Sequence, residues 1–406
     1  MSAPGLDAAK TTIIPPLFRE PQQYLVKQMT VREILPQPQD SDLNLSNLLV
    51  RGIPTSRLSA TVLRQAKKDL VKKSSRFKSS AGRESNSLRG RPDCQHVIGV
   101  DIGASNLRIA LADMGGTVLE KWSASTKKTS SPNMVIEQIR EGVEHLVNST
   151  SVSRRSLVAI AVGAPGVTDS HAGVVIATSY LKGWRDVPLR SMLESALQIP
   201  ATVENDVRLA AIGEHWTGVA RGIRNFVFLA IGTGIAAGIF ANGELIYGTD
   251  WTAGEIGYMH VPGAPERAAK QGEPGSLESV IGGEGIRQQW LRCCNGTGDS
   301  SICDLSATEI FERACTGDVS AERVLNQSAQ VLGYAVYNIS LVLNCELFVL
   351  GGGVGMSLPL RDATQRILEQ YNAPARPKLI ISSLGRDAQL VGAIRLALNK
   401  VNRASA

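Results

Sequence analysis

The chain has 406 residues, a hydrophobic fraction of 43% and a mean hydropathy close to zero, which are typical of soluble globular proteins. No apolar run reaches the roughly 20 residues that a membrane-spanning helix needs, and six cysteines in a chain of this length argue against a disulfide scaffold. The formal net charge of +6 is unevenly placed, because residues 1–93 hold 16 Lys and Arg against 8 Asp and Glu. We therefore expect a cytoplasmic protein of two or three domains, with no membrane partner and a basic N-terminal part that suits a polyanion.

The N-terminal residues predict a flexible segment, a small helical domain and a linker. Scattered prolines and little periodicity characterise residues 1–40. Helices are expected at 42–51 and 59–73, and the second carries a basic face beside an apolar stripe. The basic face consists of Arg64, Lys67, Lys68, Lys72 and Lys73. Residues 74–93 are polar, basic and rich in serine, which is typical of a linker.

Two helices of which the second is basic favour a helix-turn-helix head over residues 41–73, with or without a wing, that binds double-stranded DNA. The connection between the helices is longer than the three or four residues of a tight helix-turn-helix. A basic amphipathic helix packed on the rest of the chain is therefore the alternative interpretation.

A first glycine turn opens the part of the chain that follows the linker. Val97–Val100 and Leu107–Leu111 are expected strands, and the turn between them reads Asp101-Ile102-Gly103-Ala104-Ser105. On its own, this pattern also fits a plain hairpin with a capping aspartate.

A candidate catalytic carboxylate comes at the end of the strand expected at Ala201–Asp206. This strand ends in Asn205-Asp206, and a helix is expected from Arg208. A carboxylate can act as a general base if it stays ionised and comes within hydrogen-bonding reach of the hydroxyl group it activates. A polar strand end that caps the next helix is the alternative.

A second glycine turn lies in the most distinctive stretch of the chain. An expected strand at Phe226–Ile231 runs into Gly232-Thr233-Gly234, and another strand closes at Asn242-Gly243. Backbone N–H groups of such a turn can approach a phosphate because no side chain intervenes. An ordinary hairpin that needs positive φ is the alternative. Gly254-Glu255-Ile256-Gly257 follows, so one carboxylate is available as a base and another to fix a polyol, which suits phosphoryl transfer to a hydroxyl.

The C-terminal part adds a third glycine cluster. A long helix is expected at Ala321–Asn344 and a core strand at Cys345–Leu350, and Gly351-Gly352-Gly353 follows directly. The last expected helix is Ala388–Leu398.

Taken in this order from about Val97 to Leu398, the motifs resemble the ROK family (repressors, open reading frames and sugar kinases) of the actin-like ATPase superfamily. The resemblance implies an α/β fold of two actin-like, ribonuclease H-like lobes with a central cleft, preceded by the helical head. The expected division places the N-terminal lobe at 94–214, completed by a closing helix at 386–400, and the C-terminal lobe at 215–385.

The same resemblance implies roles for the candidate residues. Asp206 would be the catalytic base, and Asp101 would hold Mg²⁺ through water. A sugar would be bound by Asn205, Asp206, Glu255 and Glu278. A nucleotide would be bound by Asp101, Gly103, Ser105, Gly232, Thr233, Gly234, Gly351, Gly352 and Gly353.

The chain departs from the family at a zinc-binding loop. Tyr258 stands at the position of the family's histidine, and Ala269, Gln271 and Ser276 stand at three cysteine positions. His260 has no thiol nearby in the sequence. We therefore expect no structural zinc of that kind.

Two further departures concern the ligand sites. Tyr180 replaces an asparagine of the sugar-side loop, which puts one sugar contact in question. Ala236 and Ala237 replace glycines after the second glycine turn, and their methyl groups are expected to narrow the room for a phosphate.

Four features favour a sugar-responsive transcriptional regulator: the basic head, the missing zinc loop, the alanines near the second glycine turn, and a Gly-Arg-Pro stretch at 90–92 that resembles the hinge of ROK repressors. Such a protein would bind DNA through its head and a sugar or sugar phosphate in the cleft, would form a homodimer or tetramer, and would need no cofactor for regulation. The alternative is an ATP- and Mg²⁺-dependent hexose kinase of residual or weak activity, with glucokinase-like phosphoryl transfer and Asp206 as base. A third interpretation is a scaffold that binds neither ATP nor sugar.

Overall fold

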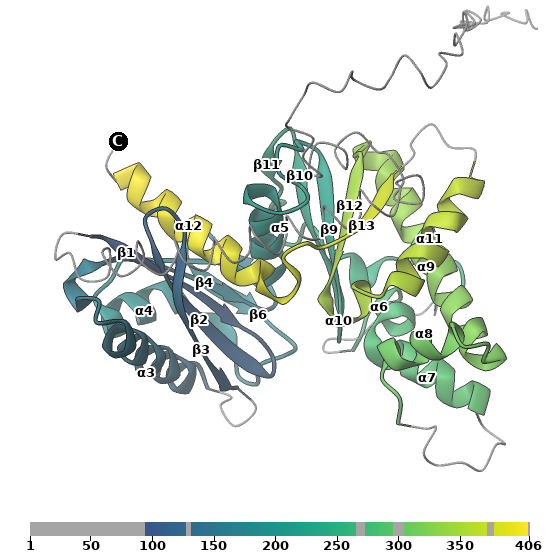
Figure 1. The fold of residues 1–406 in the computed structure, drawn as a ribbon, viewed down its shortest axis with the longest axis horizontal. Helices are drawn as coiled ribbons and strands as arrows, with labels where there is room; N and C mark the ends of the chain where they lie inside the picture. Colours follow the sequence, from purple (N-terminus) through teal and green to yellow (C-terminus); the bar gives the residue numbers. More distant parts are fainter. Residues whose placement is uncertain (1–93, 127–130, 265–272, 295–303, 372–376, 405–406) are drawn as a thin grey trace, which may run out of the picture. The chain divides into compact units, whose positions relative to one another are not determined.

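The computed structural model describes residues 94–126, 131–264, 273–294, 304–371 and 377–404. The predicted head and linker, with the candidate DNA-binding residues among them, lie outside the described residues. The described part of the chain forms two α/β lobes, each built on a five-stranded mixed sheet (Figure 1). The expectation of two actin-like lobes is confirmed.

The sheet of the N-terminal lobe has the strand order β3-β2-β1-β4-β8. Its first three strands are antiparallel, and β1, β4 and β8 run parallel. The strands are β1 (His96–Ile102), β2 (Asn106–Asp113), β3 (Val118–Ser125), β4 (Leu157–Ala164) and β8 (Ala201–Asn205). Every residue of β1 is buried, because helices cover both faces of the sheet. On one face lie α3 (Pro132–Thr150) and α4 (Leu189–Leu197), whose apolar sides join the strands in one hydrophobic cluster.

The sheet of the C-terminal lobe repeats this order and these directions as β11-β10-β9-β12-β13. The strands are β9 (Phe226–Ile231), β10 (Ile235–Ala241), β11 (Glu244–Leu245), β12 (Leu347–Gly351) and β13 (Lys378–Ile381). The helices of this lobe are α6 (Glu278–Ile281), α7 (Gly283–Cys294), α8 (Ala307–Ala314), α9 (Val319–Leu343), α10 (Gly352–Gly355) and α11 (Leu358–Gln370). The long helix expected at Ala321–Asn344 is α9, which Asp318 caps at its start and Asn344 ends in left-handed geometry.

A small antiparallel sheet of β5 (Val167–Asp169), β6 (Val174–Ala177) and β7 (Arg185–Val187) accompanies the N-terminal lobe. The sequence did not predict it, because strands of three or four residues are too short for an alternating pattern to stand out. Short single-turn helices lie at η3 (Arg154–Ser156), η4 (Ile256–Tyr258) and η6 (Gly385–Asp387).

The last helix, α12 (Ala388–Ala404), returns from the C-terminal lobe and covers the second face of the N-terminal sheet (Figure 1). It extends beyond the expected end at Leu398. Two glycines let it approach α5 (Asp206–Trp216) closely: a Cβ on Gly392 would lie 1.8 Å from the Leu209 carbonyl oxygen, and one on Gly213 2.4 Å from that of Ala388. None of the described helices combines the length and hydropathy needed to cross a bilayer.

Candidate active site

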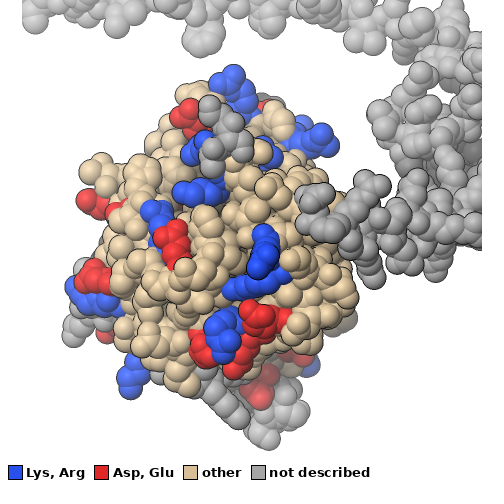
Figure 2. Space-filling model, turned by 90° about the vertical axis from the view of Figure 1, so that its left-hand side faces the viewer, with Lys and Arg blue, Asp and Glu red and all other residues tan. Residues whose placement is uncertain are grey.

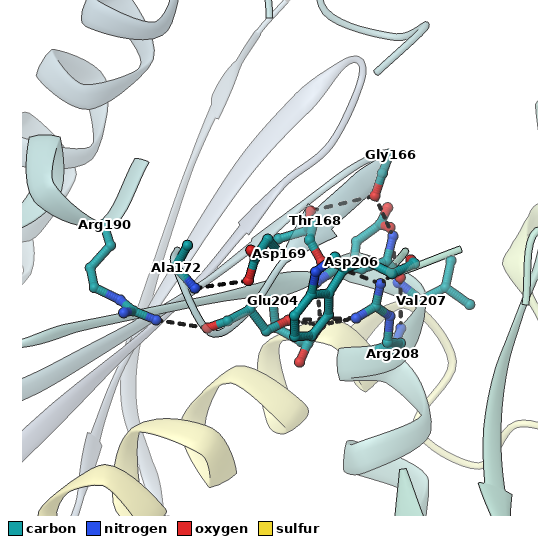
Figure 3. Close-up of polar contacts among 12 residues, drawn as sticks. Gly166, Thr168, Asp169, Ala172, Arg190, Glu204, Asp206, Val207 and Arg208 are labelled. Atoms are coloured by element: carbon teal, nitrogen blue, oxygen red, sulfur yellow. Dashed lines mark hydrogen bonds and ion pairs between the residues drawn. The ribbon is translucent and has the colours of Figure 1, made fainter. Parts of the chain in front are cut away.

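The predicted base, Asp206, begins α5 directly after β8, at the edge of the N-terminal sheet. Asn205 caps this helix: its side-chain oxygen accepts from the Arg208 N–H at 3.0 Å, and its amide nitrogen donates to the Gly166 carbonyl at 3.0 Å. These bonds fix the entry of the chain into α5, and with it the place of Asp206 (Figure 3). Helix capping, the alternative interpretation of the pair, therefore accounts for the position of Asn205.

Asp206 lies close enough to Asp101 for the two carboxyl groups to affect each other. Burial raises the pKa of Asp206 to about 7, and repulsion from Asp101 adds to this shift. Asp101 stands near the end of β1, where Arg108 Nε and Nη2 donate to its Oδ2 at 3.0 and 2.5 Å. Burial also raises the pKa of Asp101, although the Arg108 guanidinium opposes that shift. A carboxyl group with a pKa near 7 is well matched to general-base chemistry near neutral pH.

A buried ion pair between Arg208 and Glu204 links the end of β8 to the first turn of α5. Arg208 Nη1 donates to Glu204 Oε1 at 3.0 Å, and the two side chains are only 3% and 2% exposed. Arg208 Nη2 also donates to the Trp251 carbonyl at 2.8 Å, which ties α5 to the loop after β11. Glu204 Oε1 also accepts hydrogen bonds from Ser170 Oγ at 2.7 Å and from the Asn205 N–H at 2.8 Å. A further hydrogen bond joins Glu204 to Tyr247, so the pair is held by several partners, as a buried pair must be to avoid a large desolvation penalty.

The second and third glycine clusters lie side by side in the C-terminal lobe. Gly232 follows β9 and Gly353 lies just after β12, and a Cβ on Gly232 would be 4.0 Å from the Gly353 nitrogen. A Cβ on Gly353 would meet no atom within 4 Å, so the backbone there borders open space. Gly352 has a φ of +79°, and a Cβ there would lie 2.4 Å from the Ile231 carbonyl oxygen, so only glycine fits. Both turns present bare backbone to one space, which suits a phosphate or a nucleoside.

Tyr180, from the loop after β6, lies against the glycine turn of the other lobe. A Cβ on Gly234 would lie 2.1 Å from the Tyr180 hydroxyl and 2.7 Å from a carboxylate oxygen of Glu278. Burial, and then repulsion from Glu278 and Asp206, raise the pKa of Tyr180. The tyrosine at the family's asparagine position therefore reaches across to the second glycine turn and remains a neutral phenol at ordinary pH.

The two glutamates predicted to bind sugar have different surroundings. Glu278 Oε2 accepts from the Ile235 N–H at 3.1 Å, so part of its capacity fixes the start of β10. Glu255 is half-buried; its backbone N–H donates to the Thr252 carbonyl at 3.1 Å, but its side chain makes no hydrogen bond within the described part of the chain. Burial raises the pKa of both, and Arg208 opposes the shift at Glu255. The structure thus gathers Asp206, Glu255 and Glu278 around the Tyr180 hydroxyl, since all three affect its pKa.

The first glycine turn forms as expected. The Gly103 N–H donates to the Asn106 carbonyl at 2.9 Å, and Ser105 is exposed at the tip with its carbonyl accepting from the Thr126 N–H at 3.1 Å. Thr233 lies in the second turn, whose Gly232 N–H donates to the Gly234 carbonyl at 2.9 Å.

The methyl groups of Ala236 and Ala237 do not lie in the phosphate turn, contrary to the expectation from their family positions. Both residues are inside β10. Ala237 belongs to the hydrophobic core of the C-terminal lobe, whereas Ala236 packs with the cluster between α5 and that lobe's sheet. Successive residues of a strand point to opposite faces, so the two methyl groups fill the layers above and below the sheet.

At the zinc position, the Ser276 hydroxyl lies 3.2 Å from His260 Nδ1, and the Tyr258 side chain is exposed. No group of three His, Cys, Asp or Glu in the described ranges is arranged to hold a metal ion. Ala269 and Gln271 lie outside the described residues, so the absence of zinc stays a prediction.

The sequence did not single out three residues that hold the glycine turns and Asp101 in place. The Gly283 N–H donates to the Gly232 carbonyl at 2.7 Å, and Thr308 Oγ1 donates to the Gly353 carbonyl at 3.4 Å. Arg108, which holds Asp101, is the third. The Gly282-Gly283 pair was a signal that could have been used, because two adjacent glycines before a helix favour close backbone approach.

Two repeated lobes, facing glycine turns and an acidic cluster between them define a protein of the actin-like ATPase fold. The sequence model of the ROK family matches residues 97–400, about three quarters of the chain, and the chain belongs to this family.

Its relatives include both enzymes and repressors. A glucokinase of Halalkalibacterium halodurans is 31% identical over 73% of this chain and 92% of its own length. A xylose repressor of Caldicellulosiruptor bescii is 23% identical over 79% of this chain and 83% of its own length. Among solved structures, a ROK hexokinase from Thermus thermophilus is 28% identical, with a TM-score of 0.62 over 76% of this chain and all of that chain.

Proposed function

We propose that the described part of the chain transfers a phosphoryl group from ATP to a hydroxyl group of a hexose. The observation that supports this most strongly is the Asp206 carboxyl group, placed at a strand end with a pKa raised to about 7. A carboxyl group of this pKa is partly ionised at neutral pH, so it can act as a base, and it still binds a proton strongly enough to accept one from a hydroxyl group. The kinase is favoured over the regulator because Ala236 and Ala237, which were expected to narrow the room for a phosphate, pack in hydrophobic clusters along β10 instead.

Each residue of the cluster has a proposed role. Asp206 accepts the proton of the attacking hydroxyl. Glu255, whose side chain lacks a described hydrogen-bond partner, accepts from a second hydroxyl, and Glu278 contributes its other oxygen. Asn205 positions Asp206 and keeps one amide hydrogen for the sugar. Tyr180 closes the sugar side against Gly234, which excludes water from the transfer.

The nucleotide side fits ATP and Mg²⁺. The backbone of Gly232 and Gly353 borders open space, and Gly352 has a conformation that other residues adopt only with strain. ATP, when bound, supplies the transferred phosphoryl group, and Mg²⁺ supplies positive charge that offsets the negative charge of the phosphates. Asp101 would hold the metal through water, and Arg108 keeps its carboxylate oriented.

A coupled assay with ATP and a panel of hexoses tests the proposal on the parent protein and on Asp206→Asn. We expect a loss of about 10²–10⁴-fold in kcat, as for other general bases. Asp362→Asn, an exposed aspartate of α11, is the matched control and should leave turnover unchanged. Equal turnover by the parent and by Asp206→Asn would overturn the proposal.

A second candidate function is a sugar-responsive regulator that binds DNA through its head and acts as a homodimer or tetramer. The charge distribution favours it: residues 1–93 hold 16 basic and 8 acidic residues. In the rest of the chain the signs nearly balance, and Figure 2 shows Lys and Arg interspersed with Asp and Glu on the face drawn. The domain limits given above, including the head at 41–73, are part of this proposal.

A gel-shift experiment on the DNA upstream of the gene tests this second function. Lys67→Glu/Lys68→Glu should abolish binding at low salt, whereas Arg140→Glu on the exposed face of α3 should not. Addition of the sugar that binds the cleft should change the midpoint of the shift. Unchanged binding by the double variant would exclude the head as a DNA reader.

A further inference from the structure

A cavity lies at the far end of α5 from Asp206. Its volume is about 860 Å³, and its wall includes His215 and Trp216, the last two residues of the helix. Since α5 has 11 residues, this end is roughly 15 Å from the proposed base. The wall comes from both lobes: Ser170 and Thr202 belong to the N-terminal lobe, whereas Phe240 and Tyr247 belong to the C-terminal lobe. The cavity is thus separate from the proposed active site but linked to it by one helix.

The charged residues of this wall are all basic. They are Arg190, Arg221, Arg395, Lys400 and Arg403, and no aspartate or glutamate is among the lining residues. Within the described ranges no salt bridge is formed by four of them: Arg221, Arg395, Lys400 and Arg403. Other arginines and lysines of the described structure do form salt bridges. Like charges gathered around one cavity repel one another, and an anion in the cavity removes that repulsion. The charge therefore defines the ligand as an anion.

One of these cations is built into the wall. Arg190 donates from Nη1 to the His171 carbonyl at 2.8 Å and from Nη2 to that of Ser170 at 2.7 Å, which holds the turn between β5 and β6 (Figure 3). Its Nε is buried and has no hydrogen-bond partner in the described structure. This nitrogen lies against the same turn, since a Cβ on Gly173 would be 2.7 Å from it, so Arg190 contributes its positive charge to the wall rather than a free donor.

The rest of the wall suits an organic body attached to the anionic group. Arg395 lies with its Cζ 5.4 Å from the centre of the Trp216 ring, and His215 stacks on Phe240 at 4.6 Å between ring centres. Burial, followed by the charge of Arg395, lowers the pKa of His215, so this imidazole is neutral at pH 7. Ser170, Thr202 and Asn399 add neutral polar groups that can bond to hydroxyls.

We propose that this cavity binds a small organic phosphate: a phosphate monoester on a hydroxylated body of sugar size. The cations hold the phosphate, and the neutral polar and aromatic groups hold the body. Because both lobes line the cavity, the bound ligand changes the free energy of closing the lobes. It therefore changes the affinity of the proposed active site for its sugar, and the sugar changes the affinity of the cavity for the phosphate by the same factor. The binding itself does not depend on the proposed kinase activity.

Calorimetry on the full chain tests the proposal, with glucose 6-phosphate as probe and glucose and inorganic phosphate as comparison ligands. In the Glu255→Gln variant, in which hexose binding in the cleft is weakened, we expect glucose 6-phosphate to bind more tightly than either, and to bind less tightly as salt rises. Lys400→Gln/Arg403→Gln, at the exposed end of α12, should weaken binding by roughly tenfold or more. Arg395→Gln is a second, independent variant, and Arg140→Gln on α3 is the control that should bind like the parent.

The active-site variant Glu255→Gln separates this site from product binding in the cleft. Glucose 6-phosphate affinity that survives Glu255→Gln and falls in the α12 double variant supports the proposal. Affinity that falls in Glu255→Gln and is unchanged in the double variant places the ligand in the cleft and overturns it. Absence of heat with the folded parent also overturns it. So does an α12 double variant that keeps its affinity for glucose 6-phosphate and loses only DNA binding.

Discussion

Removing Arg208 should destabilise the protein strongly, because it leaves the Glu204 carboxylate buried without its counterion. Arg208→Met keeps most of the side-chain volume but removes the bond to Glu204 at 3.0 Å and the bond to the Trp251 carbonyl at 2.8 Å. Breaking a buried pair in this way destabilises proteins by about 3–5 kcal/mol. The change is measured from the urea midpoint of full-length protein, followed by tryptophan fluorescence.

Two further variants give this prediction its controls. Arg287→Met breaks the same kind of pair on the surface of α7, with exposed Glu284, and should change the free energy of unfolding by less than about 1 kcal/mol. Glu204→Gln/Arg208→Met removes both charges and should recover part of the loss.

The loss of stability in Arg208→Met should depend on pH, because it depends on whether Glu204 is ionised. Burial already raises the pKa of Glu204, and Arg208 opposes that shift, so Arg208→Met raises it further. An acid whose pKa is raised by folding stabilises the folded state when protonated, and this contribution is lost as pH rises. The defect should therefore be smaller at pH 5 than at pH 8. A loss below about 1 kcal/mol, or one that is equal at both pH values, would refute the reasoning.

Three other outcomes are expected. Gly352→Ala should lower stability and ATP affinity, because of its positive φ and the nearby Ile231 carbonyl, whereas Gly353→Ala should leave stability unchanged; equal stability of the two variants would contradict this. Elemental analysis should find no zinc in purified protein, and one zinc per chain that resists chelation would contradict the account of Tyr258. Glu255→Gln should weaken hexose binding by roughly tenfold, measured by calorimetry, with Glu120→Gln on β3 as the exposed control.

The sequence predicted the parts of the site that depend on local patterns. Strand–glycine–strand motifs identified Gly232, and the strand that ends in Asp206 identified the base, because turn chemistry and strand ends are encoded within a few residues. Contacts between distant segments were not predicted: the packing of Gly353 against Gly232 joins residues more than a hundred positions apart.

The alanines of β10 illustrate a different limit. Their family positions indicated that methyl groups had been added near a phosphate, but the face to which a strand residue points depends on the exact start of the strand. A shift of one residue reverses that face. The basic cavity was not predicted for the same reason as the glycine contacts. Arg190, Arg221 and Arg395 come together only when α4, the loop after α5 and α12 pack.

The pH dependence of hexose phosphorylation tests the central claim most directly. In the parent protein, kcat/KM should rise about tenfold per pH unit below pH 7 and level off above it, because Asp206 must lose its proton to act as base. Asp206→Asn should be slow and should lack this rise. A parent that forms no hexose phosphate at any pH between 5.5 and 8.5, or a variant that keeps the parent's rate and profile, would contradict the account.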